Sequence, residues 1–448
     1  MTGDDKALAR AIAEAVSAEG GSTYFVGGYV RDLVRGLPVK DIDIEVHGIA
    51  PTGLAAILDR FGERMEIGES FGIFALRGHA LDIAMPRKEA LRGHGHRDFD
   101  ISVDPYIGTR AAARRRDFTV NALMQNVLTE EILDPFGGLH DLERGILRHI
   151  DEKTFVEDPL RVLRAAQMAA RFGFTVAEET VALCRTMNLL TLPRERVMGE
   201  LEKALLQAER PSVFFSVLAE MGQLSYWFAE LDALRGVPQS KIHHAEGDAF
   251  THTMMVLDEA VPLATTVKNR TGLLLSAIAH DFGKAIATTE VNGEIHSYKH
   301  ESLGLPLVEQ FMKRLTAERE LIAYVKELTE HHMKPNIMAA SGASVKATNK
   351  LFDSVREPLA LVALAKADGR GKIGEDDLTL AEDFLDERLS LYYEYMARPY
   401  VMGRDLIKAG LAPSPRFSEY LAFAHKLRLA GVEKESALKQ TLAMAKKN

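Results

Sequence analysis

The chain has a single cysteine, Cys184, among its 448 residues, so it cannot form an internal disulfide. A protein without disulfides suits a reducing compartment, and we expect this one in the cytoplasm. No stretch approaches the ~18 consecutive apolar residues of a membrane-spanning helix, and the first ten residues lack the apolar core of a secretory signal. We therefore expect no membrane partner.

The sequence also lacks an excess of positive charge. Its 55 lysines and arginines are outnumbered by 64 aspartates and glutamates, which gives a formal net charge of -9. This balance argues against a generally basic coat for nucleic acid, although screening over about 8–10 Å still permits a local basic groove. The length exceeds what one hydrophobic core supports, so the chain must divide into domains.

Period-2 alternation is almost absent beyond residue 150. Before that point we expect strands within 23–28, 41–46, 72–77 and 80–85, and helices at 5–19, from about Tyr29, at 53–61 and at 116–126. After it, leucine- and alanine-rich helical periodicity prevails. The pattern predicts an α+β fold, in which an N-terminal head with a small mixed sheet is followed by all-α domains.

The run DIDIEV at 41–46 places two carboxylates in an expected strand. Because strand side chains alternate between faces, Asp41 and Asp43 share one face, and the isoleucines beside them point into the core. Two carboxylates about 7 Å apart repel each other unless a cation lies between them. Mg²⁺ binds few carboxylates together with phosphate oxygens and water, and it can activate a hydroxyl and neutralise a triphosphate.

The run GGYVRD at 27–32 suggests where the phosphates bind. Gly27 and Gly28 allow the backbone to approach an anion closely, and the helix that follows points its N–H groups at it. Arg31 adds a fork-shaped donor one turn into that helix. A DxD motif alone is more often a solvated pair, but its position nine residues after Asp32 favours a nucleotide site.

Together with three later segments, these runs resemble the nucleotidyltransferase head shared by bacterial tRNA CCA-adding enzymes and poly(A) polymerases. The later segments are RRRDFTVNAL at 114–123, EDPLRVLRAAQ at 157–167 and RERVMGELEK at 194–203. The resemblance implies stepwise transfer of nucleotides from CTP and ATP to the 3′ end of tRNA, with pyrophosphate leaving. It implies that Asp41 and Asp43 are catalytic ligands of Mg²⁺. The nucleotide-binding residues that it implies in this part of the chain are Gly28 and Arg31, with Gly27 as a further candidate.

The same resemblance extends nucleotide binding to the arginine-rich segment. Three adjacent arginines, at 114–116, are by themselves more often structural or surface groups. In the family, the arginine directly before the aspartate contacts the nucleotide phosphates, which implies this role for Arg116. Asp117 and Asn121 are further candidates that hold the geometry of the segment.

The expected helix at 157–174 is the predicted base-selecting element. Asp158 is a natural N-cap, and Pro159 suits the first helical position. A stripe of arginines is often a salt-bridged solvent face, but a rigid carboxylate and guanidinium also match the Watson–Crick edges of C or A. The resemblance implies that Asp158 and Arg161 select the base and that Arg164 also binds the nucleotide.

A further helix is expected at 194–206. Its Arg196 is a candidate partner for Asp158 or for the base. The resemblance implies that this stretch braces the base-selecting helix, and we prefer that role to a direct part in catalysis.

A second group of polar residues lies in the helical part of the chain. A lone histidine on an apolar helix is usually a core residue, but the doublet His280–Asp281 inside LLLSAIAHDFGK needs polar partners in a buried setting. Distant histidines and an aspartate can supply those partners through one or two divalent ions, because imidazole suits transition metals. The pattern H…HD…D resembles the HD phosphohydrolase superfamily, which hydrolyses phosphomonoesters or cyclic phosphodiesters.

This second resemblance implies a set of metal ligands. They are His252, His280, Asp281 and Asp368, with His300 and His332 as further candidates. The implied cofactor is a divalent transition metal of open identity, and Lys284 is a candidate for orienting phosphate. Bacterial members with this domain dephosphorylate RNA ends or open 2′,3′-cyclic phosphates, which suits repair of a damaged tRNA end.

In the C-terminal part, a strip of basic residues either follows the tRNA backbone or is an ordinary helix surface. The strip comprises Arg404, Lys408, Arg416, Lys426 and Arg428. Phe417 and Glu419 replace the small residues of the family pattern nearby, so the resemblance does not specify the RNA contact.

We predict four domains and two activities. The domains are a nucleotidyltransferase head at 1–145, a helical neck with the base-selecting helix at 146–235, an HD domain at 236–375 and a helical tail at 376–448. The predicted function is addition of CCA to tRNA from CTP and ATP, with an added phosphatase or 2′,3′-cyclic phosphodiesterase activity. The alternatives are a poly(A) polymerase, an enzyme that adds only CC or only A, and an HD phosphohydrolase with an RNA-binding head.

Overall fold

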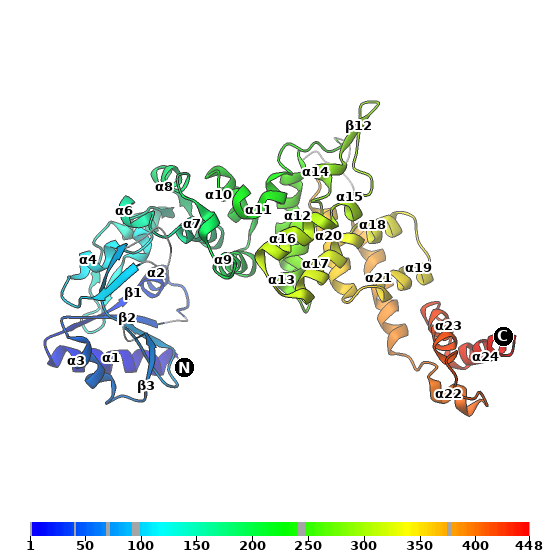
Figure 1. Ribbon diagram of the computed structural model, residues 1–448, viewed down its shortest axis with the longest axis horizontal. Helices are drawn as coiled ribbons and strands as arrows, with labels where there is room; N and C mark the ends of the chain where they lie inside the picture. The colour runs from blue at the N-terminus through cyan, green and yellow to red at the C-terminus, as the bar shows by residue number, and fades with distance from the viewer. Residues whose placement is uncertain are drawn as a thin grey trace. The chain divides into compact units, whose positions relative to one another are not determined.

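The computed structural model describes residues 2–39, 42–68, 72–91, 99–240, 247–373 and 378–447. The chain forms two compact units, Met1–Ala204 with Val213–Tyr226 and Leu205–Ser212 with Trp227–Asn448. Figure 1 shows the large sheet in the first unit, coloured blue to cyan, and mostly helices in the rest of the chain. The predicted α+β class is confirmed, whereas the four-domain division stays a prediction.

The first unit contains a mixed sheet of seven strands. Their order across the sheet is β3 (Arg64–Gly68), β4 (Ile73–Leu76), β5 (Leu81–Ala84), β2 (Ile42–His47), β1 (Ser22–Val26), β8 (Met124–Asn126) and β9 (Ile132–Leu133). β2 and β5 are parallel, and the other neighbouring pairs are antiparallel. β6 (Arg87–Leu91) and β7 (Phe99–Val103) form a separate antiparallel pair.

Helices cover the apolar face of this sheet. α1 (Thr2–Ala18) packs against β1, β2 and α3 (Pro51–Leu58). The alternation of β2 buries Ile42, Ile44 and Val46 in the core and turns its polar residues to the other face. α2 (Gly28–Val34) follows β1 almost directly and contacts both β1 and β2, so the glycine turn and the carboxylate-bearing strand are neighbours.

The prediction of a helix at 116–126 is wrong. The segment forms a short 3₁₀ turn, η2 (Thr119–Asn121), and then strand β8. Met124 is fully buried and pairs with Val26 of β1, and Asp117 accepts a hydrogen bond from the Phe118 N–H at 2.8 Å. Sheet pairing and this local side-chain bond replace helical hydrogen bonds in a run whose apolar spacing also fits a helix.

Short helices complete the first unit. They are α4 (Thr109–Arg114), α5 (Gly138–Arg144), α6 (Glu152–Phe155), α7 (Leu160–Phe172), α8 (Glu178–Cys184), η3 (Leu189–Thr191), α9 (Arg194–Gln207), α10 (Ser212–Glu220) and the start of α11 (Leu224–Asp232). α7 and α9 are the helices expected at 157–174 and 194–206. The helix begins one residue later than predicted, with Pro159 rather than Asp158 at the N-cap, although the Asp158 carboxylate accepts a hydrogen bond from the Leu160 N–H at 3.1 Å. A two-residue parallel pair, β10 (Ile146–Leu147) with β11 (Thr175–Val176), adds to the expected helices.

The second unit is almost entirely helical. Its elements after α11 are α12 (Ala249–Ala264), α13 (Arg270–Ala279), α14 (Lys284–Ala287), β12 (Thr289–Val291), β13 (Glu294–His296), α15 (His300–Leu303), α16 (Leu305–Leu315), α17 (Arg319–His331), α18 (Met333–Ala340), α19 (Val345–Asp353), α20 (Pro358–Arg370), α21 (Thr379–Ala397), α22 (Gly403–Lys408), α23 (Phe417–Leu429) and α24 (Lys434–Lys447). α12, α13, α17 and α20 pack together through fully buried leucine, alanine and valine side chains. This packing brings segments that are distant in sequence around the His-Asp doublet.

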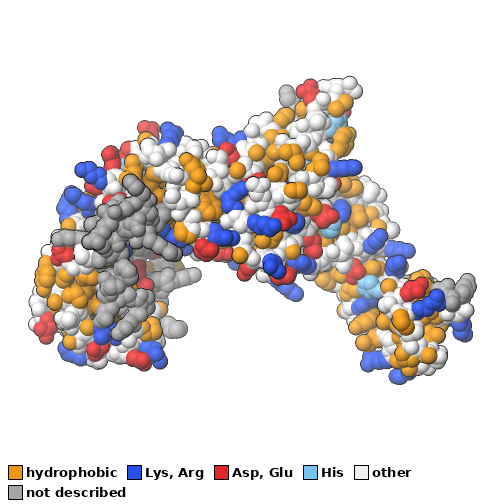
Figure 2. Space-filling model, in the orientation of Figure 1, with side chains coloured by type: hydrophobic (Ala, Val, Ile, Leu, Met, Phe, Trp, Pro, Cys, Tyr) orange, Lys and Arg blue, Asp and Glu red, His pale blue; other side chains and the backbone are white. Residues whose placement is uncertain are grey.

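The distribution of surface charge agrees with the composition. On the face shown in Figure 2, lysine and arginine side chains are interspersed with aspartate and glutamate. Within the described ranges, no helix is both long and apolar enough to cross a bilayer.

Candidate active sites

Strand β2 carries Asp43 on the polar face of the sheet, where the side chain is half-buried. Asp41 lies outside the described residues. Asp43 is in register with Asp82 of the parallel strand β5, so the two carboxylates point to the same face. Asp82 was not predicted; the signal was its polar position in the alternating run at 80–85. Neighbouring carboxylates on strands about 4.8 Å apart are hard oxygen donors that fit a Mg²⁺ ion.

Glu45 is buried on the same face and was also missed by the sequence analysis. His47 lies 2.9 Å from Glu45, and Arg116 Nη2 lies 3.4 Å from Glu45 Oε2, with Arg115 at 4.0 Å. Burial alone would raise the pKa of Glu45, but His47 and the two arginines reverse this effect and lower it to about 2. The ionised carboxylate thus holds Arg116 on the face that carries Asp43.

The glycine turn meets these two residues. Gly27 has φ +66°, and a β-carbon there would lie 3.1 Å from Arg116 Nη1 and 4.0 Å from Asp43 Oδ2. A side chain at this position would therefore be strained and would crowd the arginine. Gly28 begins α2, and a β-carbon there would lie 3.5 Å from Arg31 Nη2. The predicted residues Gly27, Gly28, Arg31, Asp43 and Arg116 are thus brought together.

The Arg31 guanidinium contacts two polar side chains and one aromatic ring. Its Nε donates to Asp32 Oδ1 at 2.8 Å, and its Nη1 donates to Asn121 Oδ1 at 2.8 Å. Its guanidinium carbon lies 4.4 Å from the ring centre of Phe172 at the end of α7, and Arg35 lies 5.0 Å from the same ring. These contacts fix the guanidinium of Arg31, and its further N–H groups can still bind an anion.

Asp117 and Asn121 connect this arginine to α7, the predicted base-selecting helix. Asn121 Nδ2 donates to Asp117 Oδ1 at 2.9 Å, and Arg164 donates to Asp117 Oδ2 from Nε at 2.7 Å. Burial favours a raised pKa for Asp117, but Arg164 and Asn121 lower it, so the carboxylate is ionised. Arg164 also lies 3.9 Å from the buried Glu200 of α9. The predicted supporting role of Asp117 and Asn121 therefore has a geometric basis.

The two predicted base-selecting residues are also braced. Asp158 Oδ2 accepts a hydrogen bond from Arg196 Nη2 at 2.9 Å, which is the partner that the sequence suggested. Arg161 donates from Nη1 to the Thr154 carbonyl at 2.6 Å and from Nη2 to the Arg115 carbonyl. Two hydrogen bonds to backbone fix the plane of the guanidinium, which a base-reading arginine requires.

In the second unit, four buried histidines share one hydrogen-bonding pattern. Each Nδ1 faces a backbone carbonyl: His252 with Gly371 at 3.2 Å, His280 with Ala277 at 2.8 Å, His300 with Ser297 at 2.9 Å and His332 with Thr329 at 2.7 Å. A neutral ring that donates from Nδ1 leaves Nε2 as an acceptor, which is the form that binds metal ions.

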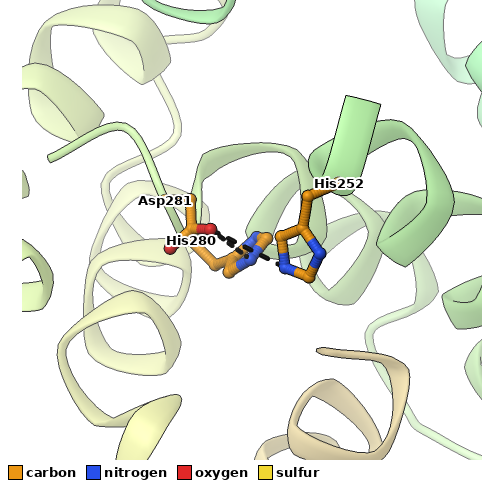
Figure 3. A group of neighbouring side chains, drawn as sticks. All are labelled: His252, His280 and Asp281. Atoms are coloured by element: carbon orange, nitrogen blue, oxygen red, sulfur yellow. Dashed lines mark ion pairs between the residues drawn. The ribbon is translucent and has the colours of Figure 1, made fainter. Parts of the chain in front are cut away.

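Three of the predicted ligands point toward one another in Figure 3. His280 Nε2 lies 3.2 Å from Asp281 Oδ2, and His252 Nε2 lies 3.8 Å from Asp281 Oδ2 and 3.1 Å from Asp368 Oδ1. His280 Nε2 has no hydrogen-bond partner among the residues that the structure describes. A cation between this acceptor and the carboxylates would satisfy it, so the residues fit a divalent metal.

His300 and His332 face the other oxygen of the same carboxylate. Their Nε2 atoms lie 3.1 Å and 3.9 Å from Asp281 Oδ1 and 3.3 Å from each other. Burial, assisted by His280, lowers the pKa of His332 to about 3 and keeps its ring neutral. The two oxygens of Asp281 therefore face two donor sets, which offers two adjacent metal positions and brings both further candidates into the site.

A pocket of about 210 Å³ opens onto these residues. Lys284 Nζ lies 2.7 Å from Asp281 Oδ2 and donates to Gln239 Oε1 at 2.6 Å. Lys372 Nζ, which was not predicted, lies 3.6 Å from Asp368 Oδ2. Burial alone would raise the pKa of Asp281, but His280, Lys284 and His300 hold it well below its usual range. The pocket thus joins buried carboxylates to two ammonium groups that can bind phosphate.

One residue of the basic strip in the tail, Arg428, has several partners within the protein. Arg428 donates to the Tyr395 carbonyl at 3.1 Å and to the Met396 carbonyl, and lies 4.5 Å from the Tyr400 ring centre. Its guanidinium therefore braces the helices of the tail. The structure provides this structural reason for Arg428 to be basic, and an RNA contact is not needed to explain it.

Comparisons with known proteins identify the class of the head and the family of the chain. Residues 23–148 match the family described as the poly A polymerase head domain, and residues 173–234 match the one described as the probable RNA and SrmB-binding site of polymerase A. The class defined by the fold and the polar face of the sheet is therefore a nucleotidyltransferase with a poly(A) polymerase-type head.

Longer relatives specify the family. The chain is 37% identical over 363 residues to the multifunctional CCA protein of Actinobacillus pleuropneumoniae serotype 5b, covering 78% of this chain and 86% of that protein. It is 35% identical over 401 residues to the multifunctional CCA protein of Pasteurella multocida, covering 86% and 91%. The chain belongs to the family of multifunctional CCA proteins.

Solved structures share the fold at low identity. The Thermotoga maritima CCA-adding enzyme complexed with tRNA has a TM-score of 0.67 and 21% identity, covering 98% of this chain and 95% of that one. The Bacillus stearothermophilus CCA-adding enzyme in complex with CTP has a TM-score of 0.65 and 21% identity, covering 98% and 97%.

Proposed function

We propose that this protein adds CCA to the 3′ end of tRNA from CTP and ATP and releases pyrophosphate. The observation that carries the proposal is the meeting of Asp43, Gly27 and Arg116 on the polar face of the sheet, beside Asp82. Carboxylates for a cation lie next to a turn and a guanidinium for phosphate. The relatives' names, and the tRNA and CTP held by the similar solved enzymes, support this substrate assignment.

The chemistry is a displacement at phosphorus. The terminal 3′-hydroxyl of the RNA forms a bond to the α-phosphorus, the bond from that phosphorus to the bridging oxygen breaks, and pyrophosphate leaves with the bond electrons. Asp41, Asp43 and Asp82 would hold Mg²⁺, which neutralises phosphate charge and eases loss of the hydroxyl proton. The Gly27–Gly28 turn and the first N–H groups of α2 bind phosphate oxygens.

The arginines position the nucleotide. Arg116, held by Glu45, and Arg31, held by Asn121, place guanidinium groups beside the glycine turn. Donors that are already oriented lower the activation barrier, because they need not reorganise when negative charge moves to the leaving pyrophosphate.

Base selection falls to α7 in this proposal. Asp158 offers an acceptor and Arg161 a pair of donors to the Watson–Crick edge, and Arg164 contacts the nucleotide nearby. Each of the three is held by a protein partner, which keeps their pattern constant from one addition to the next. A constant pattern is what selection without a nucleic-acid template requires.

The test uses tRNA that ends before CCA, after C and after CC, each with labelled CTP or ATP. We expect C on the first two substrates, A on the third, and no incorporation by Asp43→Ala. Long ATP-only products would support a poly(A) polymerase, and a stop after CC would support partial addition. Retained incorporation of CTP by Asp43→Ala would overturn the assignment of the site.

We also propose a phosphohydrolase activity for the second unit, which the four-histidine pattern favours. His252, His280, Asp281 and Asp368, with His300 and His332, would hold one or two divalent transition metals, which activate water and polarise the phosphoryl group when bound. Lys284 and Lys372 bind phosphate oxygens. Water oxygen bonds to phosphorus, and the ester oxygen leaves and takes a proton, which frees an alcohol or opens a 2′,3′-cyclic phosphate.

This second activity is tested with 2′,3′-cyclic and 3′-monophosphate RNA ends in Mg²⁺, Mn²⁺, Co²⁺, Ni²⁺ or Zn²⁺ separately. We expect metal-dependent release of phosphate or ring opening that His280→Ala abolishes while CTP incorporation continues. Hydrolysis that is unaffected by His280→Ala would refute the assignment.

A further inference from the structure

We infer that Tyr298, on the rim of the second unit's pocket, is the platform on which the base of a nucleotide substrate stacks while its phosphate lies beside Asp281 and Lys284. This inference rests on the proposed phosphohydrolase function. It identifies a specificity-determining residue on the β12–β13 hairpin, outside the ligand set.

The inner end of the pocket is built for a phosphoryl group. Asp281 and Asp368 lie there with Lys284 and Lys372, so that a metal site and two ammonium groups face one cavity. Gln239 is buried in the same wall, and Lys284 donates to its carbonyl oxygen at 2.6 Å. This hydrogen bond fixes the Lys284 ammonium beside Asp281, where it can bind a phosphate oxygen.

The pocket is too small to enclose a nucleotide. Its volume of about 210 Å³ lies below the range of roughly 300–1,000 Å³ typical of sites that bury a whole small-molecule ligand. A ligand whose phosphate reaches the carboxylates must therefore extend past the rim. The residues of the rim then decide which phosphate esters bind well.

Tyr298 lies on that rim, and its ring is accessible for stacking. It lines the pocket, yet 71% of its surface is exposed. Its ring stacks on His296, with ring centres 4.9 Å apart and an angle of 11° between planes. His296 thus covers one face of the ring, and the exposed surface offers the remainder to a planar ligand.

Hydrogen bonds of Ser297, the residue before Tyr298, link this ring to the proposed metal site. The Ser297 carbonyl, one residue before Tyr298, faces His300 Nδ1 at 2.9 Å. The Ser297 hydroxyl lies 2.8 Å from Thr288 Oγ1, which joins the two ends of the hairpin segment. Figure 1 shows this hairpin projecting beside α14 and α15, and Figure 2 shows hydrophobic, acidic and histidine side chains on its surface. The ring therefore has a defined position relative to the phosphate end.

Single exposed tyrosines are common and need no function, so the test must separate stacking from mere exposure. The full-length, metal-loaded protein is assayed with adenosine 3′-phosphate and with glycerol 2-phosphate, which has no ring. For Tyr298→Ala we expect KM for adenosine 3′-phosphate to rise about tenfold, because a base stacked on an aromatic residue contributes binding of this order. Hydrolysis of glycerol 2-phosphate should not change.

Two variants serve as controls. Tyr298→Phe retains the ring and should behave as the unmodified protein. Tyr106→Ala removes a tyrosine of the first unit with similar exposure, 69%, and should leave both substrates unaffected. Equal effects of Tyr298→Ala on both substrates, or no effect on either, would overturn the inference.

The stacking inference can also be judged if no hydrolysis occurs, which would count against the phosphohydrolase proposal. Calorimetric titration of metal-loaded protein then compares adenosine 3′-phosphate with inorganic phosphate. If Tyr298→Ala binds adenosine 3′-phosphate more weakly but inorganic phosphate as tightly as the unmodified protein does, the stacking inference is supported. Equal nucleotide binding by the variant and the unmodified protein rejects it.

Discussion

The two candidate metal sites use carboxylates in opposite settings. On the sheet, Asp43 is half-buried and Asp82 is exposed, and the fixed groups around them are arginines. In the helical unit, the aspartates are buried and the histidines are oriented by backbone carbonyls. In the proposed functions, the sheet site would receive its cation together with a triphosphate, whereas the helical site would retain its metal.

The difference follows from the cost of burial. A carboxylate that faces water remains solvated between turnovers, so the sheet site is stable without its ion. Buried carboxylates and an unsatisfied imidazole nitrogen instead make metal binding part of the stability of the folded unit. The comparison therefore predicts different responses to mutation and to metal removal.

The largest expected effect tests whether the exposed carboxylate shares the sheet site. Asp82→Asn keeps the size of the side chain, replaces one acceptor oxygen with an NH2 donor and removes the charge beside Asp43. We expect the rate of CTP incorporation to fall by about a hundredfold or more, because the site binds the cation with one negative charge fewer. This loss corresponds to about 2.7 kcal/mol of transition-state stabilisation. Single-turnover incorporation assays measure this.

The matched control for Asp82→Asn is Asp59→Asn, an exposed aspartate on the same unit that pairs only peripherally with Arg64 at 3.2 Å. It should leave incorporation unchanged. If Asp82→Asn retained full activity, the cation would be held without the second strand, and the two-strand description of the site would be wrong.

Local patterns in the sequence predicted the parts of the sites that depend on neighbouring residues. Alternation identified β2 and the face of Asp43, and the Asp-Pro pair at 158–159 identified the start of α7 to within one residue. The helix expected at 116–126 failed because a short run with apolar residues fits both periods, and pairing with β1 decided the outcome. Such pairing joins residues that are far apart in the chain.

The missed residues depend on contacts of this long-range kind. Glu45 and Asp82 are single carboxylates in strands, and their importance comes from Arg116 and from the parallel neighbour Asp43. The histidine and aspartate ligands were named from a resemblance, yet their division around the two oxygens of Asp281 required the packing of several helices. Physical reasoning from sequence therefore supplied candidates, and the fold supplied their partners.

Metal removal should lower the stability of the second unit, which holds the buried histidine site, but not that of the first. We expect chelation to lower the unfolding temperature of the second unit, and a transition metal at 100 times its dissociation constant to restore about 2.7 kcal/mol. That corresponds to several degrees for a unit of this size. Mg²⁺ alone should give little change, since the sheet site gains its phosphate ligands only with a nucleotide.

Differential scanning calorimetry on the full chain measures both responses. Asp281→Asn, which changes the ligand common to both donor sets, should abolish the effect of the transition metal, whereas His331→Ala, a neighbouring histidine that contacts Lys334 at 2.8 Å, should preserve it. An equal shift with Mg²⁺ alone, or a metal response that survives in Asp281→Asn, would contradict the contrast between the two sites.

The smallest expected effect concerns the support of Arg31 in the sheet site. Phe172→Leu removes the ring beneath that guanidinium but leaves its hydrogen bonds to Asp32 and Asn121. A cation–π contact contributes about 0.5–1 kcal/mol at an accessible site, so KM for CTP and for ATP should rise together by about two- to fivefold. The choice between C and A should not change, because the proposed base-selecting residues are Asp158 and Arg161. Phe174→Leu, whose ring lies beside Arg35 at 4.9 Å, is the control and should leave KM near its original value. Altered base choice in Phe172→Leu would instead mean that the ring acts through α7, and the phosphate and base functions would then be less separate than the contacts indicate.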